Sequence, residues 1–340
     1  MKLLVLGGTI FLGRHVVEAA RARGHEVTLF HRGQHNPGLF PDLPVVLGDR
    51  KTDLEKLAGG SWDAVLDTSG YVPRVVTESA RFFADRAQHY TFISSISVFS
   101  DLTKPWIDES APVGRLETET EEVTGETYGP LKALCEEAAE AAMPGRVWNV
   151  RPGLIVGPDD PTHRFTYWPA RFAQGDEILV PDIPNEPIQV IDVRDLAEWL
   201  VRGMEEKLTG VYNATGPAEP FTWRELVDTC TDVVASGPDA PAVHPHVTWV
   251  SEAFLQEKKV GAWMELPLWV PVEPESVAFS RISIEKAKQA GLTFRPLEAT
   301  VRDTLAWFRT QPDRDWPAGL AERKESALLT DWHRTVAENA

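Results

Sequence analysis

The chain has 340 residues, 43% of them hydrophobic and 25% charged, which suits a globular protein with one large domain or two lobes. Its net charge of −17 disfavours binding to nucleic-acid backbones, because each phosphate contact needs a lysine or arginine. Two cysteines, Cys135 and Cys230, provide neither a disulfide framework nor a metal-binding cluster. No apolar run approaches the ~20 residues of a membrane span, and no signal-peptide pattern is present, so we expect a cytoplasmic protein.

Strand and helix patterns alternate along the first half of the chain. Residues 3–7 form an apolar run that predicts a buried parallel strand. Residues 11–24 follow with the helical spacing of apolar residues and end at Gly24. The pattern continues with strands predicted at 26–32, 44–49, 62–69, 89–97 and 146–152, and with helices at 75–87 and 130–142. This alternation predicts an α/β fold with a doubly wound parallel sheet of the Rossmann type.

The pattern becomes less regular after residue 152. Residues 153–187 are rich in proline and tryptophan, residues 188–206 return to a strand and a helix, and residues 210–216 form one more strand pattern. Beyond residue 217, helical segments alternate with proline-rich joints. We therefore expect residues 1–152 and 188–216 to form the Rossmann domain, and residues 153–187 and 217–340 to form a smaller, interleaved C-terminal lobe.

The first strand and helix are joined by the glycine-rich segment GGTIFLG, residues 7–13. In this context a glycine-rich turn directs backbone N–H groups and a helix N-terminus at a pyrophosphate. Gly7 permits the tight turn and Gly13 the close helix packing, whereas Ile10 replaces the usual middle glycine and must point its side chain away. A ligand-free turn is the alternative, but the order of strand, loop and helix favours a dinucleotide site. Its expected contacts are Gly7, Thr9, Ile10, Phe11, Leu12 and Gly13.

The end of the second strand predicts which dinucleotide binds. Proteins that prefer NAD place a carboxylate there, to accept from the ribose 2′-hydroxyl. This chain instead has His31 and Arg32, and a cation suits the 2′-phosphate of NADP, so NADP is expected and NAD remains an alternative. A solvated loop arginine is the competing interpretation of Arg32. Asp49, after the third strand, is the right type to accept from an adenine amino group, or it serves as a turn residue.

Tyr128 and Lys132 are four residues apart, which places both on one face of a helix. A phenol titrates near pH 10 in water, and a neighbouring ammonium group makes it a better acid–base group by favouring the phenolate. Pro130 is tolerated only in a first turn, so Tyr128 is predicted at the helix start, near the carboxyl ends of the strands. A surface tyrosine and lysine are the alternative. The serines of FISSISVF end the fifth strand, in the order that favours a catalytic set: Ser94, Ser95 and Ser97.

These motifs resemble the extended short-chain dehydrogenases/reductases of the NAD(P)-dependent epimerase/dehydratase family. The resemblance covers about residues 1–216 and is found, in family order, in GGTIFLG, GDR, WDAVLDTSG, FISSISVFS, YGPLKALCE, VRPGLIVGP, VIDVRDLA and GVYNATG. It implies that Tyr128 is the acid–base residue, with Ser95 and Lys132 as its partners. It also implies a substrate-binding role for the C-terminal lobe and is compatible with a homodimer. Its further implied contacts are Arg50, Thr68, Ser69, Gly70, Ser94 and Lys132 for the cofactor, and Tyr71 and Ser97 for the substrate.

Two features depart from the usual family pattern. With Ile10 in the glycine loop, the chain is similar to a branch with chloroplast stem-loop-binding-like and bacterial reductase-like members. An acidic insert, residues 115–126, lengthens the interval between Ser95 and Tyr128. We interpret the insert as a solvated loop, with a lid or substrate-sensing loop as the alternative.

The resulting hypothesis is an NAD(P)-dependent oxidoreductase that transfers hydride at a carbonyl or carbinol carbon of a small molecule. The alternatives are a sugar-nucleotide epimerase, a non-catalytic RNA-binding protein on the same fold, against which the negative charge argues, and a silent NADP-sensing regulator. Dehydration is disfavoured because no acidic pair lies beside Ser95. Arg164 and Trp168 are candidates for holding a nucleotide-sugar-like substrate, with packing of the lobe as an equal alternative.

Overall fold

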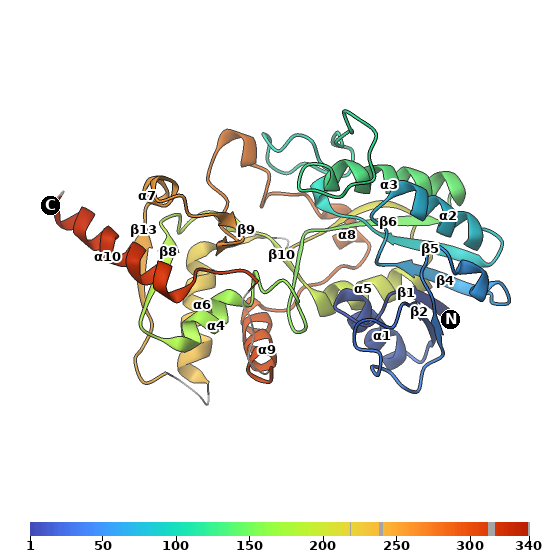
Figure 1. Cartoon of the computed structure of the whole chain (residues 1–340), viewed down its shortest axis with the longest axis horizontal. Coiled ribbons are helices and arrows are strands. Elements are labelled where there is room, and N and C mark those ends of the chain that lie inside the picture. Colours follow the sequence, from blue (N-terminus) through green and yellow to red (C-terminus); the bar gives the residue numbers. More distant parts are fainter. Residues whose placement is uncertain (218, 238–240, 312–316, 339–340) are drawn as a thin grey trace. The chain divides into compact units, whose positions relative to one another are not determined.

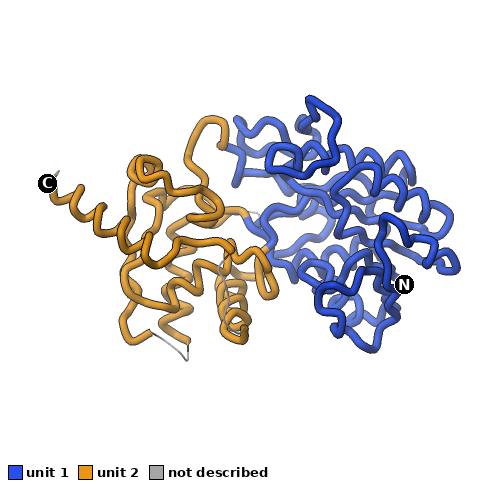
Figure 2. Tube along the Cα trace, in the orientation of Figure 1, with its two compact units in different colours: residues 1–155, 190–218, 277–294 blue, residues 156–189, 219–276, 295–340 orange. Residues whose placement is uncertain are grey.

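The computed structural model describes residues 1–217, 219–237, 241–311 and 317–338. The chain divides into two compact units, each assembled from three segments (Figure 2). The first unit contains Met1–Ile155, Val190–Ala218 and Val277–Phe294. The second unit contains Val156–Gln189, Glu219–Ser276 and Arg295–Ala340.

The sequence predicts residues 277–294 in the C-terminal lobe, but the structure places them in the first unit. Here the short helix α8 (Glu285–Gln289) packs against the strand β11 (Gly210–Ala214). Ala287 and Leu292 are buried in the core beside this sheet, and Ile282 is buried with Val98 and Phe99. A helix of 5 residues is too short to show a clear helical repeat of apolar residues. The sequence therefore does not reveal that the chain returns to the first unit here.

A seven-stranded parallel sheet forms the centre of the first unit, in the order β11-β6-β5-β4-β1-β2-β3. The other strands are β1 (Lys2–Leu6), β2 (Glu26–His31), β3 (Val45–Leu47), β4 (Trp62–Asp67), β5 (Ala87–Ile93) and β6 (Val147–Pro152). Apolar runs form these strands because the inner ones are covered on both faces, so that Leu3, Leu4 and Val5 are fully buried. The predicted doubly wound parallel sheet is confirmed. Its order reverses between β1 and β4, and ligands bind at the carboxyl ends of the strands beside such a reversal.

Helices cover both faces of this sheet (Figure 1). One face packs against α1 (Leu12–Ala22) and α5 (Val193–Glu205), where Trp148 and Trp199 meet edge to face with ring centroids 4.7 Å apart. The other face packs against α2 (Pro73–Phe83) and α3 (Tyr128–Ala142), around Phe83, Tyr90 and Phe92. Short elements of the unit are η1 (Leu54–Leu57) and η2 (Ile96–Val98). The strand β7 (Leu154–Val156), whose last residue belongs to the second unit, pairs with β10 (Val190–Asp192).

The second unit is a mixture of helices and two-stranded pairings. Its elements are α4 (Tyr167–Gln174), β8 (Glu177–Pro181), β9 (Pro187–Ile188), β12 (Phe221–Thr222), α6 (Trp223–Ser236), β13 (His246–Val250), α7 (Glu252–Glu257), β14 (Ala262–Trp263), β15 (Leu266–Pro267), η3 (Pro274–Ser276), α9 (Leu297–Arg309) and α10 (Glu322–Glu338). Trp168 and Trp223 are buried in its core, with ring centroids 5.1 Å apart. Among the described residues, no helix has both the length and the apolarity needed to cross a bilayer.

Candidate functional site

The glycine loop between β1 and α1 has a backbone that only glycine accommodates. Gly7 and Gly8 have φ angles of 116° and 101°, in the region that L side chains rarely adopt. A Cβ atom on Gly13 would lie 2.8 Å from both the Cα and N atoms of Gly8. The first turn of α1 therefore packs directly on the loop backbone, with the N–H groups of the helix start available to an anion. This cradle fits the pyrophosphate of a dinucleotide.

Ile10 points away from this loop, as the sequence requires. Its side chain is 46% exposed, whereas the neighbouring Thr9 is buried. The Thr9 carbonyl oxygen accepts a hydrogen bond of 2.8 Å from the side-chain amide of Asn36, which has a φ angle of 45°. Asn36 is not recognisable as a loop contact from the sequence. Its one signal there is its residue type, because an asparagine adopts a positive φ angle more easily than most residues.

The end of β2 presents one cation to solvent. The backbone N–H of Gly33 donates to His31 Nδ1 at 3.0 Å, and burial lowers the pKa of His31, so its imidazole is neutral near pH 7. Arg32 is exposed and makes no hydrogen bond or ion pair with any residue that the structure describes. Arg32 is thus available to a bound anion at this position.

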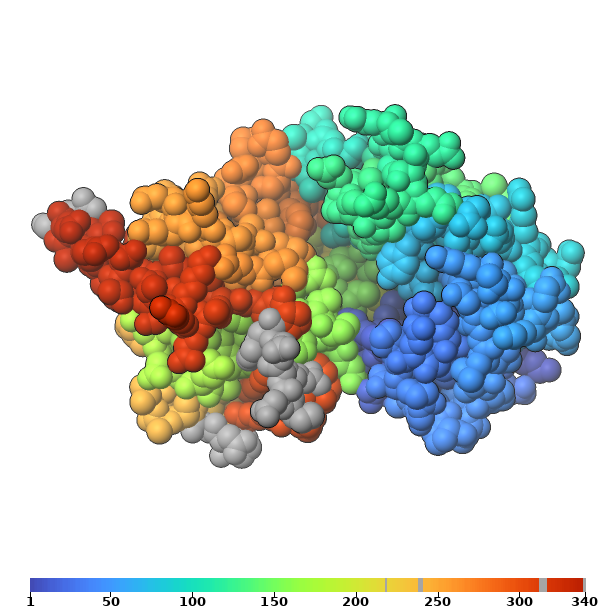
Figure 3. All heavy atoms as spheres, viewed as in Figure 1, coloured from blue at the N-terminus to red at the C-terminus, as the bar shows by residue number. Residues whose placement is uncertain are grey.

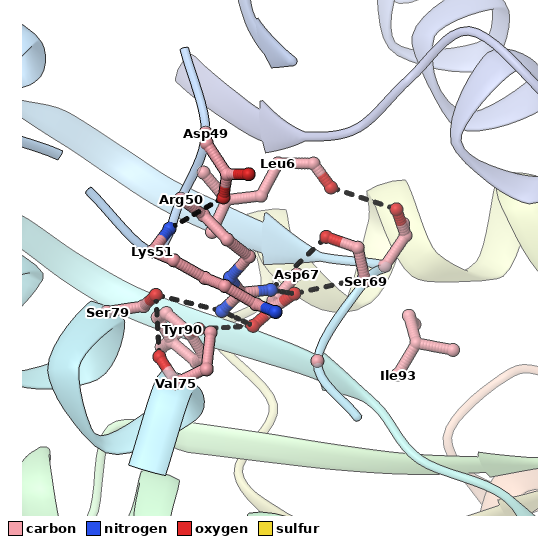
Figure 4. Close-up of polar contacts among 12 residues, drawn as sticks. Leu6, Asp49, Arg50, Lys51, Asp67, Ser69, Val75, Ser79, Tyr90 and Ile93 are labelled. Carbon is pink, nitrogen blue, oxygen red and sulfur yellow. Dashed lines mark hydrogen bonds and ion pairs between the residues drawn. The ribbon is translucent and has the colours of Figure 1, made fainter. Parts of the chain in front are cut away.

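Asp49 and Arg50 both take part in protein contacts. Asp49 Oδ1 accepts from the backbone N–H of Lys51 at 2.9 Å, which is the turn role that competes with adenine binding. Arg50, expected at the cofactor, turns inward and pairs with Asp67, with Nη–Oδ distances of 2.5 and 2.6 Å (Figure 4). Because Asp67 is fully buried at the end of β4, it attracts the guanidinium group into the protein.

The segment after β4 lies between the glycine loop and α3. Thr68 Oγ1 donates to the carbonyl oxygen of Leu6 at 2.9 Å, and it would contact a Cβ atom placed on Gly7. The backbone N–H of Ser69 donates to Asp67 Oδ1 at 3.0 Å. The Gly70 carbonyl oxygen accepts from Lys132 Nζ at 2.8 Å. One short segment thus connects two parts of the expected cofactor site.

Lys132 is held in a nearly closed environment. Only 3% of it is exposed, and its ammonium group also donates to the carbonyl oxygen of Ile93 at 2.5 Å. The pKa of Lys132 is lowered to about 8, chiefly by burial and to a smaller extent by the positive charge of Arg50, against the opposing effects of Cys135, Asp67 and Glu136. A lysine that is buried but hydrogen-bonded, at the carboxyl ends of parallel strands, is typical of a functional group.

Tyr128 begins α3, one turn before Lys132 on the same side of the helix. A side chain on Gly129 would collide with the carbonyl oxygen of Ser97, so glycine permits the close approach of α3 to η2. The Tyr128 ring also lies beside Tyr71, with centroids 6.4 Å apart, and Lys132 Nζ is 5.3 Å from the Tyr71 ring centroid. Four of the residues expected from the sequence are therefore brought together: Tyr71, Ser97, Tyr128 and Lys132.

The serines after β5 have different partners. Ser95 Oγ donates to Ser97 Oγ at 3.0 Å, and the Ser97 backbone N–H donates to Ser95 Oγ at 3.1 Å. Ser94, expected at the cofactor, donates to Glu136 at 2.5 Å, and Glu136 forms a buried ion pair with Arg151 at 2.7 Å. Ser94 thus stabilises the connection between β5 and α3, a role that nothing in the sequence indicates.

A cavity of about 590 Å³ lies beside Tyr128 and is partly walled by the acidic insert. Its lining comprises residues 97–100, Gly114, residues 123–126 and residues 128–130. Glu121 of the insert forms an ion pair with Arg74 of α2 at 2.8 Å, which connects the insert to this helix. The insert (between the teal and green of the colour scale) lies on the surface in Figure 3. Residues 123–126 of the insert therefore border the cavity, while most of the insert is exposed to solvent.

The two substrate candidates of the second unit have local partners. Trp168 is 0% exposed and its indole N–H donates to the carbonyl oxygen of Pro267 at 3.0 Å, so it packs the core and presents no surface to a substrate. Here the packing alternative is correct for Trp168. The Arg164 guanidinium lies over the Trp263 ring, 5.1 Å from its centroid, and donates to Thr162 Oγ1 at 3.2 Å.

Two curated proteins illustrate what the chain is similar to. Epimerase family protein SDR39U1 of Bos taurus is 26% identical over 246 residues, which cover 66% of this chain and 78% of that protein. Chloroplast stem-loop binding protein of 41 kDa b of Arabidopsis thaliana is 28% identical over 271 residues, which cover 72% of this chain and 65% of that protein.

Solved structures share the fold at lower identity. The enzyme WbmH of Bordetella bronchiseptica, in complex with NAD+, superposes with a TM-score of 0.65 at 17% identity, covering 91% of this chain and 98% of that one. UDP-glucose 4-epimerase of Thermotoga maritima, with UDP-glucose, gives a TM-score of 0.64 at 15% identity, covering 91% and 99%. Residues 3–214 match the sequence profile of one family, which is also the family that the motifs resemble. The chain belongs to the NAD dependent epimerase/dehydratase family.

Proposed function

We propose that the protein is a nicotinamide-dinucleotide-dependent oxidoreductase that acts on a carbonyl or carbinol carbon, with Tyr128 as the acid–base residue. The observation that supports this most directly is the setting of Lys132, which is one helical turn from Tyr128 and hydrogen-bonded to Gly70 and Ile93. A fixed ammonium group at this position favours the phenolate form of a tyrosine and so prepares it for proton transfer.

The chain has the groups needed to hold the cofactor. The loop at residues 7–13 offers backbone N–H groups to the pyrophosphate, and residues 68–70 line the space beside it. Arg32 pairs with a 2′-phosphate, which is why we propose NADP over NAD. When bound, the nicotinamide ring supplies or accepts the hydride.

The protein groups act on the substrate oxygen. Ser95 turns its hydroxyl proton from Ser97 to this oxygen and orients it, while Tyr128 exchanges a proton with it. Lys132 favours the phenolate form of Tyr128 and thereby eases the transfer of its proton. We propose that the cavity bordered by Ser97, Tyr128 and the insert receives the part of the substrate that surrounds the reacting carbon.

Net reduction or oxidation and epimerisation share this first step, so the choice between them depends on the cofactor. An exchangeable NADP cofactor is expected of an oxidoreductase, and this favours it here. A tightly retained NAD would instead indicate an epimerase. Nucleotide sugars are the first substrate class to test, because the Thermotoga maritima epimerase of the same fold was solved with UDP-glucose.

The test is a fluorescence titration of the protein with NADPH and NADH, followed by assays against aldehydes, ketones and UDP-glucose. We expect NADPH to bind more tightly, and Tyr128→Phe to retain this binding while turnover falls by a factor on the order of 10² to 10⁴. Absence of binding by either nucleotide, or full turnover in Tyr128→Phe, would exclude the proposal. Because of the Arabidopsis thaliana relative, stem-loop RNA is included as a probe; its binding at low salt without nucleotide binding would support the RNA alternative.

A further inference from the structure

An ion pair beneath the expected cofactor site has no role in the function proposed above. Arg50 and Asp67 form two hydrogen bonds of 2.5 and 2.6 Å, with side chains that are 11% and 0% exposed. Arg50 follows β3 and Asp67 ends β4, and these strands are not neighbours in the sheet. The pair therefore joins two loops that the sheet itself does not connect.

Three further groups fix the geometry of this pair (Figure 4). The Arg50 guanidinium also donates to Ser79 Oγ on α2 at 2.8 Å and to Ser69 Oγ at 3.2 Å. Tyr90 of β5 donates its hydroxyl to Asp67 Oδ2 at 2.6 Å. A planar guanidinium group can satisfy several acceptors at once, which a lysine cannot do with the same directionality. Asp67, at the carboxyl end of β4, thus accepts hydrogen bonds from Arg50, from Tyr90 and from the backbone N–H of Ser69.

The consequence concerns the residues that follow Asp67. Thr68 contacts the glycine loop at Gly7, and the Gly70 carbonyl oxygen accepts from Lys132. A shift of residues 67–70 would move two groups together: Thr68, which lies against the glycine loop, and the carbonyl oxygen of Gly70, which accepts from Lys132. Arg50 holds the first residue of this segment and, through Ser69, its third.

We propose that Arg50 is a positioning residue: through Asp67 and Ser69 it sets the segment 67–70, and thereby the placement of Lys132 and of the cofactor. The inference deepens the proposed function and rests on it for the cofactor, but not for Lys132. Arg50 itself need not contact the cofactor.

The charges around Lys132 provide a readout of the ion pair at the lysine itself, and the charge-preserving variant Arg50→Lys described below tests geometry separately. Lys132 is faced by Arg50 and Asp67, by Cys135 and Glu136 of its own helix, and by the ring of Tyr71. Arg50 lowers the pKa of Lys132 and Asp67 raises it. Arg50→Met should therefore raise the pKa of Lys132, and Asp67→Asn should lower it. General loosening would admit water and raise the pKa in both variants.

The experiment measures the titration of the Lys132 side chain by ¹³C NMR in the protein without added nucleotide, with the signal assigned by its loss in Lys132→Met. The same variants are then titrated with NADPH. The matched control is Arg171→Met, because Arg171 forms a comparably buried ion pair with Glu325 in the second unit, at 2.7 Å with side chains 12% and 3% exposed. We expect opposite shifts for Arg50→Met and Asp67→Asn, none for Arg171→Met, and NADPH affinity weaker by on the order of tenfold in Arg50→Met.

Two more variants distinguish charge from geometry. Arg50→Lys should leave the pKa of Lys132 close to that of the wild type, because the positive charge is kept. It should still weaken NADPH binding, because an ammonium group cannot form hydrogen bonds to Asp67, Ser69 and Ser79 together. Arg50→Met/Asp67→Leu removes both charges, which proteins often tolerate in folding, and it should still bind NADPH more weakly than wild type.

Equal effects of Arg50→Met and Arg171→Met on Lys132 and on NADPH would overturn the inference, as would shifts of one sign in Arg50→Met and Asp67→Asn. A wild-type protein that binds no nicotinamide nucleotide would overturn the proposed function instead. The NMR result would then still decide whether the charge of Arg50 acts on Lys132.

Discussion

Lys132 Nζ lies 2.8 Å from the carbonyl oxygen of Gly70, which connects α3 to the loop after β4, 62 residues earlier in the chain. The ammonium group is almost completely removed from water by this contact and by that with Ile93. Burying a charge is costly even where hydrogen bonds offset part of the cost. The protonated Lys132 therefore lowers the free energy of unfolding of the protein. This cost has a measurable dependence on pH.

We predict that the free energy of unfolding of the wild type rises with pH between about 8 and 10.5, relative to Lys132→Met. In this interval the unfolded chain keeps the Lys132 proton, while the folded chain, in which burial lowers the pKa of Lys132 to about 8, has lost it. Below pH 8 both states are protonated and the difference is constant. At about 1.4 kcal/mol per pKa unit, the total rise approaches about 3 kcal/mol.

Urea unfolding of both proteins at pH 7, 8, 9 and 10 provides the measurement, and the difference between them removes the contribution of other titrating groups. An exposed lysine, Lys56, serves as the control position, because Lys56→Met should show no such trend. A difference between wild type and Lys132→Met that stays flat from pH 7 to 10 would contradict the prediction.

Arg32 should determine which nicotinamide dinucleotide binds. Arg32→Gln is expected to weaken NADPH binding by about 1.5–3 kcal/mol, the range for a hydrogen bond to a charged group, and to leave NADH binding unchanged. Only NADPH has the 2′-phosphate that requires a cation. Titration by fluorescence checks this, with Arg81→Gln on the exposed side of α2 as the control. Equal losses for the two nucleotides would show that Arg32 does not contact the 2′-phosphate.

Gly13→Ala tests the cradle of the glycine loop. The new Cβ atom would lie 2.8 Å from backbone atoms of Gly8, which cannot move aside as a flexible side chain can. We expect loss of nucleotide binding and a destabilisation of about 1–3 kcal/mol from the overpacked contact. Gly24→Ala is the control. Gly24 has a φ angle of 78° and open space where the new Cβ atom would lie, so this substitution introduces backbone strain without a steric clash. Nucleotide binding should survive in Gly24→Ala.

Much of the first unit follows from local patterns in the sequence. The apolar run at residues 3–7 and the spacing of Tyr128, Pro130 and Lys132 predict a buried strand and a helix start, because each depends on neighbouring residues only. The role of Arg50 could not be predicted in this way. In the sequence it belongs to a GDR motif beside an expected adenine site, and its pairing with Asp67 becomes visible only when β3 and β4 are placed in space.

The same limit applies to Glu136 and Glu137, two adjacent glutamates of α3. Each forms an ion pair, at 2.7 Å with Arg151 and at 2.6 Å with Arg115, and the sequence does not distinguish them. Their side chains are 7% and 53% exposed. Removing a buried partner leaves the opposite charge uncompensated, whereas an exposed pair is already weakened by water.

We therefore predict that Glu136→Ala destabilises the protein by about 3–5 kcal/mol, and Glu137→Ala by no more than about 1 kcal/mol. Urea unfolding at pH 7 compares the two variants on the same helix, where the loss of a glutamate has the same intrinsic effect on helix propensity. Glu136→Ala also leaves Ser94 without its acceptor, so Ser94→Ala should add little to it when the two changes are combined. Equal destabilisation by the two glutamate variants would mean that water reaches the Glu136–Arg151 pair in solution.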